Sequence, residues 1–298
     1  MEEKLVSIII PCYNCSSFVG KLLDSLLIQD YKSIEIFAID DGSTDGTFKR
    51  LTEFEQDFTR KGYSYQVLHQ ENEGQSSTIN KGLKLISGAF LLWPDADDWF
   101  EDSTTISKMV SALQNHPDYN CVRVLPYYVD GKSQNKSPIR PTEIKENLFY
   151  DFLYWNNNIW APAGSHMIKT EVLFENIKAR NIFTSRNIGQ NYQLILPVLY
   201  KGKCFTIQQH LYNILIRKGS HSRGTYSTCE QEIGRWEESA AMLISVISDI
   251  PQMDNSEKNN IINFIIKRYN KLNYKTAIHH RHFLTAFKYF IKFILDKQ

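Results

Sequence analysis

Three carboxylates, Asp95, Asp97 and Asp98, lie within four residues, directly after the apolar run at residues 90–93. Like charges this close repel each other, and burial strengthens the repulsion unless a cation neutralises them. Mg²⁺ or Mn²⁺ suits carboxylate oxygens and keeps open positions for water or phosphate. The spacing therefore favours metal-assisted chemistry on a phosphate-containing substrate, with a solvated acidic turn before a helix as the alternative.

Polar and aromatic residues also follow two earlier apolar runs, at residues 5–10 and 34–39. In an open parallel sheet the ligand binds beyond the carboxyl ends of the strands, so we expect these residues to gather near Asp95. They are Tyr13, Asn14, Asp40 and Asp41, with Pro11 at the end of the first run.

The elements that must position these residues alternate between strand and helix over the first 125 residues. This alternation predicts an α/β fold with a mostly parallel sheet flanked by helices. Strands are expected at 5–10, 34–39, 65–68, 90–93 and 121–125, with one helix capped by Ser16 and another at 75–86. Residues 130–142 read as a long surface loop. From residue 228 onward the pattern is helical, so we expect a domain at 1–227, in halves 1–125 and 126–227, followed by a helical region at 228–298.

The composition is that of a globular protein, with 42% hydrophobic and 22% charged residues in 298. A net charge of +1 gives no general attraction to nucleic acid, and we expect no nucleic-acid partner. The acidic first residues and short first apolar run do not form an export signal, and no run of about 20 apolar residues is present. Five cysteines are most simply reduced thiols, so we expect a cytoplasmic protein, including the inner face of the membrane.

Four motifs together resemble glycosyltransferase family 2 in order and spacing. They are Ser-Ile-Ile-Ile-Pro-Cys-Tyr-Asn at 7–14, Asp-Asp-Gly-Ser-Thr-Asp-Gly at 40–46, Asn-Glu-Gly-Gln at 72–75 with Asn-Lys-Gly at 80–82, and Asp-Ala-Asp-Asp-Trp at 95–99. The resemblance covers about the first 110 residues. It implies a GT-A fold, a nucleotide-diphosphate sugar donor with UDP-sugar favoured, a divalent cation (Mn or Mg), and transfer with inversion to a glycan or lipid-linked acceptor in surface polysaccharide synthesis.

The resemblance also assigns roles to residues of this chain. It implies that Asp40 accepts a hydrogen bond from the base, that Asp95 meets the ribose, and that Asp97, with Asp95, reaches the diphosphate through the metal. A departing nucleoside diphosphate develops negative charge, which a cation stabilises. Ile79 replaces the arginine usual before Asn80, so one polar contact to the donor is missing. The other residues implied to bind the donor are Pro11, Tyr13, Asn14 and Asn80.

A later basic segment at 217–223 resembles the mobile segment of the same family. There the resemblance implies that His221 joins the metal shell, while Arg217 and Arg223 suit a diphosphate because guanidinium groups match phosphate oxygens. A solvated basic turn is the alternative.

The chain departs from the family where the general base is expected. The matching stretch reads Gly-Gln-Asn at 189–191, and no Asp or Glu occurs from residue 176 to 229. Gln190 and Asn191 can orient an acceptor through hydrogen bonds, but an amide cannot act as a base. Three accounts remain open: a base from elsewhere such as His166, which is expected in a loop before a helix; a transfer that tolerates weak base catalysis; or a non-catalytic nucleotide-sugar binder. A nucleotidyltransferase ranks below these, because residues 11–15 hold neither Gly nor a basic residue.

The end of the chain carries an amphipathic pattern. Apolar residues share one face and Arg281, Lys288 and Lys292 share the other, which suits an interfacial helix that holds the enzyme near a lipid-linked acceptor. An end helix packed on the catalytic domain is the alternative. The apolar residues are Phe283, Leu284, Phe287, Phe290, Ile291 and Ile294.

Overall fold

The computed structural model describes residues 3–159, 162–217 and 226–295. The chain divides into two compact units. Unit 1 comprises residues 1–182 and 190–217, and unit 2 comprises residues 183–189 and 218–298. Each unit is described by itself. The sequence boundary expected at 227 and 228 stays a prediction.

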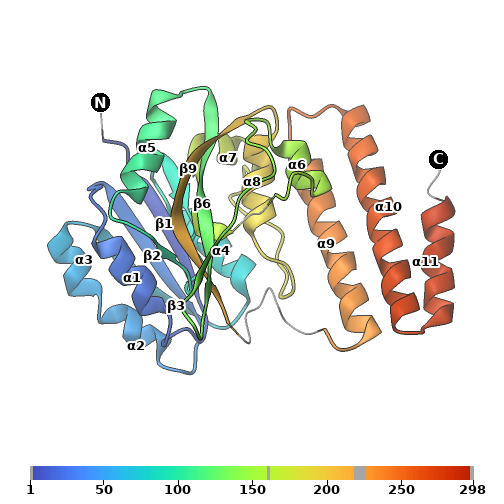
Figure 1. The fold of residues 1–298 in the computed structure, drawn as a ribbon, viewed down its shortest axis with the longest axis horizontal. Coiled ribbons are helices and arrows are strands. Elements are labelled where there is room, and N and C mark those ends of the chain that lie inside the picture. Colours follow the sequence, from blue (N-terminus) through green and yellow to red (C-terminus); the bar gives the residue numbers. More distant parts are fainter. Residues whose placement is uncertain (1–2, 160–161, 218–225, 296–298) are drawn as a thin grey trace. The chain divides into compact units, whose positions relative to one another are not determined.

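Every strand among the described residues belongs to unit 1 and to one sheet (Figure 1). Its order is β3-β2-β1-β4-β8-β6-β9-β5, with β7 paired to β6. Strands β1 to β4 are parallel, and so are β6 and β9, whereas β8 runs antiparallel to both of its neighbours. The strands are β1 Val6–Cys12, β2 Ile34–Asp41, β3 Ser64–Gln70, β4 Phe90–Leu92, β5 Trp99–Phe100, β6 Tyr119–Asp130, β7 Lys136–Pro138, β8 His166–Lys169 and β9 Lys203–Ile216.

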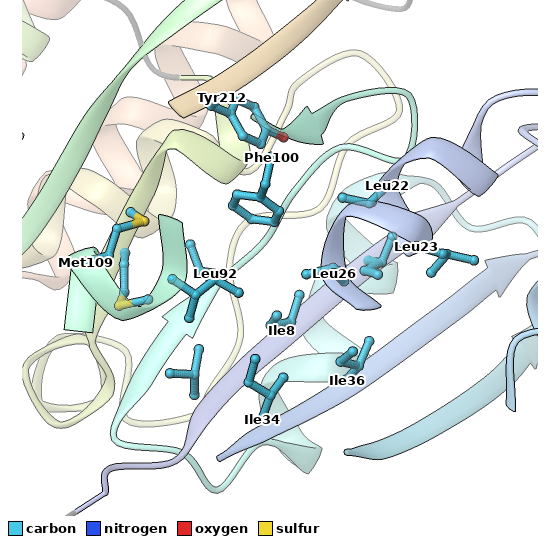
Figure 2. Packing of buried hydrophobic residues seen from close by; sticks show 14 of the residues in the cluster. Ile8, Leu22, Leu23, Leu26, Ile34, Ile36, Leu92, Phe100, Met109 and Tyr212 are labelled. Carbon is cyan, nitrogen blue, oxygen red and sulfur yellow. The ribbon is translucent and has the colours of Figure 1, made fainter. Parts of the chain in front are cut away.

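Helices cover both faces of this sheet. Leu22 and Leu26 of helix α1 (Val19–Leu27) pack with Ile8 of β1 and Ile36 of β2 in a fully buried cluster (Figure 2). Fully burying each such side chain contributes roughly 1.5–3 kcal/mol, which makes this cluster a main source of unit 1 stability. The helices of unit 1 are α1 Val19–Leu27, α2 Thr47–Thr52, α3 Glu55–Lys61, α4 Gln75–Leu85, α5 Thr105–Asn115, α6 Phe149–Tyr154, η1 Ala163–Ser165, α7 Thr170–Asn176 and α8 Asn191–Leu199.

Helix α4 packs on the opposite face of the sheet from α1. A Cβ placed on Gly82 of α4 would lie 2.6 Å from the Ile9 side chain, so this helix approaches β1 closely on the Ile9 side. Ile8, next along β1, belongs to the cluster that contains α1. Successive residues of a strand point to opposite faces of the sheet, so the side chains of Asp40 and Asp41 at the end of β2 also lie on opposite faces.

Unit 2 contains three long helices, α9 Cys229–Asp249, α10 Asn255–His279 and α11 Phe283–Leu295. Helix α9 begins with a capping box between Thr228 and Gln231, and Asp254 caps α10 by accepting from the backbone N–H of Glu257. Helix α10 packs against both α9 and α11. The helical C-terminal region expected from the sequence is confirmed.

Several local expectations were wrong. Residues 130–142 are not one loop, because β7 at residues 136–138 pairs with an extended β6. His166 does not lie in a loop but opens β8. Ser16 does not cap α1; its hydroxyl donates instead to the Asp45 carboxylate at 2.9 Å.

Candidate active site

The acidic motif forms a turn directly after β4, closed by the Asp98 N–H donating to the Asp95 carbonyl at 3.1 Å. Asp95 and Asp97 are partly exposed, whereas Asp98 is buried. The three carboxylates predicted from the sequence to act together therefore lie together, with two of them open to a ligand.

Two side-chain amides hold Asp95. Gln75, the first residue of α4, donates its Nε2–H to Asp95 Oδ1 at 2.9 Å, and the Gln190 side chain also hydrogen-bonds to this carboxylate. Burial, and next the negative charge of Asp97, raise the pKa of Asp95 to about 7 in spite of both hydrogen bonds. Asp95 is thus held by neutral amides, and its carboxylate oxygens are the kind of ligand that a hard cation prefers.

Asp97 has a cationic partner. Arg217 Nε donates to Asp97 Oδ2 at 2.9 Å, and the guanidinium lies 4.3 Å from the centre of the Phe18 ring. The structure therefore brings the predicted Arg217 to the acidic turn. The other predicted residues of that segment, His221 and Arg223, lie outside the described residues.

Asp98, unlike its neighbours, is buried and holds the acidic turn in place. Its Oδ1 accepts from the Leu215 N–H at 3.0 Å, and the buried Tyr212 side chain lies beside it. Burial, followed by the charges of Asp95 and Asp97, raises the pKa of Asp98 well above its usual value. A carboxyl group in this position fastens the acidic turn to β9.

The two aspartates at the end of β2 face opposite sides of the sheet. Asp40 Oδ2 lies 2.7 Å from His69 Nδ1, and the His69 ring contacts Phe48 of α2. Asp41 instead accepts backbone N–H bonds at 2.9 Å from Glu73 and Gly74, just before α4. Asp41, which the sequence analysis named but gave no contact, thus lies on the α4 face with Asp95.

The start of α4 depends on Gly74, which has φ +95° and ψ 162°. This conformation is open to glycine and strained for other residues. It places the Gly74 N–H on Asp41 and lets Gln75, the next residue, reach Asp95. Gly74 and Gln75 therefore link Asp41 at the end of β2 with Asp95 in the acidic turn after β4.

The loop after β1 lies at the same edge of the sheet. Pro11 is buried near the end of β1, whereas the Tyr13 side chain is 53% exposed and available for contact. Asn14 is fixed to the loop after β2: its N–H donates to Ser43 Oγ, and its side-chain Oδ1 accepts from the Thr44 N–H, both at 2.9 Å.

The amide pair lies at the start of α8, where the general base was expected. Gln190 is buried and reaches Asp95, as described above. Asn191 Oδ1 accepts from the Trp93 indole N–H at 3.0 Å. Gln190 and Asn191 thus both lie near the acidic turn. The side-chain oxygen of Asn191 is already hydrogen-bonded to Trp93, the residue that follows β4.

Two predicted residues have surroundings that suggest structural roles. The Asn80 side chain donates to the Ile182 carbonyl at 3.0 Å and accepts from the Ile182 N–H at 2.7 Å. His166 is fully buried, and burial together with the charge of Arg123 lowers its pKa to about 3. An inaccessible, neutral imidazole is poorly placed to contact an acceptor.

The residues of the acidic turn fit a divalent cation whose shell is completed by substrate. Among the described residues, no three His, Cys, Asp or Glu side chains are grouped so as to hold a metal ion by themselves. Asp95 and Asp97 nevertheless supply hard oxygen ligands at one turn of the chain. Mg²⁺ and Mn²⁺ commonly take one or two carboxylates plus substrate phosphates.

The decisive comparison is with protein families. Residues 7–177, which contain the acidic turn, β8 and all but the first residue of β1, match the sequence model described as glycosyl transferase family 2. The chain belongs to glycosyl transferase family 2. The recognition made from the four motifs is therefore confirmed.

Relatives within the family come from several bacteria. Glycosyltransferase GlyA of Streptococcus pneumoniae is 31% identical over 233 residues, which cover 75% of this chain and 32% of that protein. The uncharacterized glycosyltransferase EpsJ of Bacillus subtilis is 36% identical over 114 residues, 38% of this chain and 32% of EpsJ. The chain thus spans about a third of the length of these two relatives.

Solved structures share the fold of this chain at low sequence identity. Residues 1–349 of S. aureus TarS in complex with UDP-GlcNAc give a TM-score of 0.67 at 16% identity, covering 98% of this chain and 89% of that one. The Pyrobaculum calidifontis mannosyltransferase with GDP-Man and Mn²⁺ gives 0.57 at 15% identity, covering 100% and 89%. The predicted GT-A α/β fold is confirmed. In the part of the chain that is described, no helix combines the length and apolar character needed to cross a bilayer.

Proposed function

We propose that this chain is an inverting, divalent-metal-dependent glycosyltransferase that moves a sugar from a UDP-sugar to a hydroxyl of a glycan or lipid-linked acceptor in surface polysaccharide synthesis. The observation that carries the proposal is the contact of one carboxylate, Asp95, with Gln75 of α4 on one side and Gln190 at the start of α8 on the other. The resemblance assigns the stretch with Gln75 to the donor and the stretch with Gln190 to the acceptor, so their shared contact with Asp95 supports a donor and an acceptor meeting at the acidic turn.

The donor nucleotide would lie along the edge formed by the loop after β1, the start of α4 and the acidic turn. Tyr13 is exposed enough to pack on the base. We assign the hydrogen bond from the base to Asp40, because its Oδ1 is buried without a hydrogen-bond partner while its Oδ2 faces His69. Both oxygens of Asp41 already accept hydrogen bonds, from Gln70, Glu73 and Gly74. Asp95 and Asp97 would hold the cation, and Arg217 would face the diphosphate.

In the reaction, the acceptor oxygen attacks the anomeric carbon while the bond from that carbon to the diphosphate oxygen breaks. A cation bound at the turn supplies stabilisation of the negative charge on the leaving diphosphate. The acceptor proton must pass to a base, and an amide cannot accept it near neutral pH. Asn191 is therefore assigned to orienting the acceptor, with the proton removed by a group outside the start of α8.

A non-catalytic nucleotide-sugar binder is the second candidate. It is favoured by the start of α8, where Gln190 and Asn191 stand and neither amide can accept a proton near neutral pH. The two candidates share donor binding and differ only in product formation.

Donor binding and turnover test the proposal. We expect UDP to bind in the presence of Mn²⁺ or Mg²⁺, as followed by calorimetry, and to lose affinity on adding EDTA or on Asp97→Asn, with GDP as the comparison nucleotide. Asp57→Asn, at an exposed helical position of unit 1, is the matched control. Equal UDP binding with and without metal would remove the metal assignment, and binding without transfer or donor hydrolysis over a panel of UDP-sugars would favour the binder.

Asn191→Asp tests the assignment of the amide. A positioned general base is worth roughly 10²- to 10⁴-fold in rate. We expect a loss of transfer, because the charged carboxylate would lie near Asp95 and Asp97 and repel them. A gain on that scale would instead show that the natural chain lacks only its base.

A further inference from the structure

Helix α11 exposes an unusually large apolar face. Ala286 and Tyr289 are buried, whereas Leu284 is 90% and Phe287 64% exposed. At about 100° per residue, the exposed apolar side chains occupy one continuous arc of the helix. Contiguous apolar patches of this kind on a folded protein mark an interaction site. The members of the arc are Phe283, Leu284, Phe287, Phe290, Ile291, Ile294 and Leu295.

Basic residues border this arc on both sides. On α11 itself, Lys288 and Lys292 lie with their Nζ atoms 5.2 and 5.3 Å from the centre of the Tyr289 ring. On α10, Lys267 and Lys271 lie 5.7 and 5.9 Å from the centre of the Phe293 ring. These lysines can keep their charges in water while their stems lie along apolar surface.

The charge of the whole segment is strongly one-sided. From residue 259 to 295 the sequence contains no Asp or Glu. Along this part of α10 and α11 the bases therefore have no acidic neighbours in sequence. The carboxylates that reach the segment come from α9, where Glu232 pairs with His280 and Glu237 accepts from the Tyr289 hydroxyl. Its seven bases are Lys267, Arg268, Lys271, Lys275, Arg281, Lys288 and Lys292.

We propose that this face of unit 2 binds the surface of an anionic lipid bilayer, with α11 lying in the plane of the interface. An apolar arc bordered by lysines is the pattern of helices that insert their apolar side at the headgroup boundary and attract anionic lipids. The 13 residues of α11 are too few to span the hydrocarbon core, which needs about 20. The surface serves binding and is independent of the function proposed for unit 1.

The charge distribution favours a lipid surface over a second copy of the chain. Pairing two identical α11 faces would bring the same excess of positive charge together from both sides, and like charges across an interface oppose association. Anionic headgroups complement the lysines and leave the apolar arc free to enter the acyl boundary.

Vesicle flotation of the full chain tests the apolar part of the proposal. We expect the protein to float with vesicles of phosphatidylcholine mixed with phosphatidylglycerol, to float weakly with phosphatidylcholine alone, and to dissociate at high salt. The double variant Leu284→Ser/Phe287→Ser should bind roughly tenfold less or weaker still. Ile28→Ser/Ile144→Ser, which removes exposed apolar side chains from unit 1, is the matched control and should bind like the natural chain.

Lys288→Gln/Lys292→Gln tests the contribution of positive charge to binding. Its control is Lys84→Gln/Lys178→Gln, which removes two exposed lysines from unit 1. The first pair should reduce binding to the anionic vesicles and weaken its salt dependence, and the second should not. Absence of flotation with anionic vesicles, or equal flotation of Leu284→Ser/Phe287→Ser, would overturn the proposal. A lipid-free dimer seen by light scattering and abolished by Leu284→Ser/Phe287→Ser would also overturn it, by giving the face to a second copy.

Discussion

Asp95, Asp97 and Asp98 have the same side chain but three different environments. Asp95 is held by neutral amides, Asp97 by a guanidinium, and Asp98 by a backbone N–H in a buried site. The sequence predicted that these carboxylates act together, because their spacing is local. It could not divide their roles, since Gln75, Arg217 and Leu215 reach the turn from distant parts of the chain.

His166 illustrates how burial alone can change a residue's assignment. Its pKa falls to about 3 from an ordinary 6.5, first because of burial and second because of the Arg123 charge. Below pH 6.5 the unfolded chain takes up a proton that the folded chain refuses, so stability present above pH 6.5 is lost as the pH falls toward 3. This single group should cost about 2 kcal/mol at pH 5.

His166→Asn should remove that part of the pH dependence. Urea unfolding at pH 5 and pH 8 measures it, as the change in unfolding free energy between the two pH values for each protein. His279→Asn, at an exposed position, is the control for losing a histidine. The same pH dependence in the natural chain and in His166→Asn would refute the explanation.

The absence of a side chain at Gly164 lets the backbone lie directly against Tyr212, which is next to Asp98 of the acidic turn. A Cβ at this position would lie 2.4 Å from the Tyr212 hydroxyl oxygen and 2.5 Å from its ring. Tyr212 is fully buried and cannot move away freely, so Gly164→Ala should destabilise the protein by about 1–3 kcal/mol. In Gly234→Ala, the added methyl meets nothing within 4 Å inside α9, and this control should be neutral or stabilising in the same thermal unfolding experiment.

At the scale of elements, local patterns predicted local structure. The apolar runs of β1 and β2 and the helical spacing of α1 are continuous in sequence, and these elements were placed correctly to within a few residues. In the second half of the sheet, the strand predicted at 121–125 is part of β6, whereas β8 and β9 were missed. Strand β9 is 14 residues long and pairs with β6 from about 80 residues away, and the four residues of β8 run antiparallel between β4 and β6. Such pairings depend on distant partners and leave no periodic signal in the sequence.

Helix α9 offers a test of a locally encoded element. Thr228 accepts from the Gln231 N–H at 3.2 Å, and the Gln231 side chain accepts from the Thr228 N–H in return. Thr228→Ala removes the cap and should weaken the first turn by about 1 kcal/mol, whereas Thr228→Ser keeps it. Hydrogen exchange of the first α9 amides measures the difference. Equal exchange in the Ala and Ser variants would show that the cap contributes little.

At the scale of the whole molecule, the candidate site and the apolar helix face belong to different units. Asp41, Gln75, the acidic turn and Gln190 are all in unit 1, whereas α11 is in unit 2. The sequence separated a nucleotide-binding part from a helical part, because their residue patterns differ. The sequence could not show that residues 183–189 belong to unit 2, although unit 1 lies on both sides of them in the chain, because this short segment has no distinguishing composition.

This division predicts where a donor nucleotide changes protection from hydrogen exchange. A ligand that binds only the folded state slows local opening by up to about a hundredfold at about 100 times its Kd. With UDP and Mn²⁺, we expect slower exchange in peptides that contain residues 11–14, 72–75 and 95–98, and unchanged exchange in α10 and α11. Asp97→Asn measured under the same conditions should lose this protection, because it removes an oxygen ligand from the turn. Equal protection in α10 and α11, or protection that survives both Asp97→Asn and EDTA, would contradict the assignment of nucleotide binding to the acidic turn of unit 1.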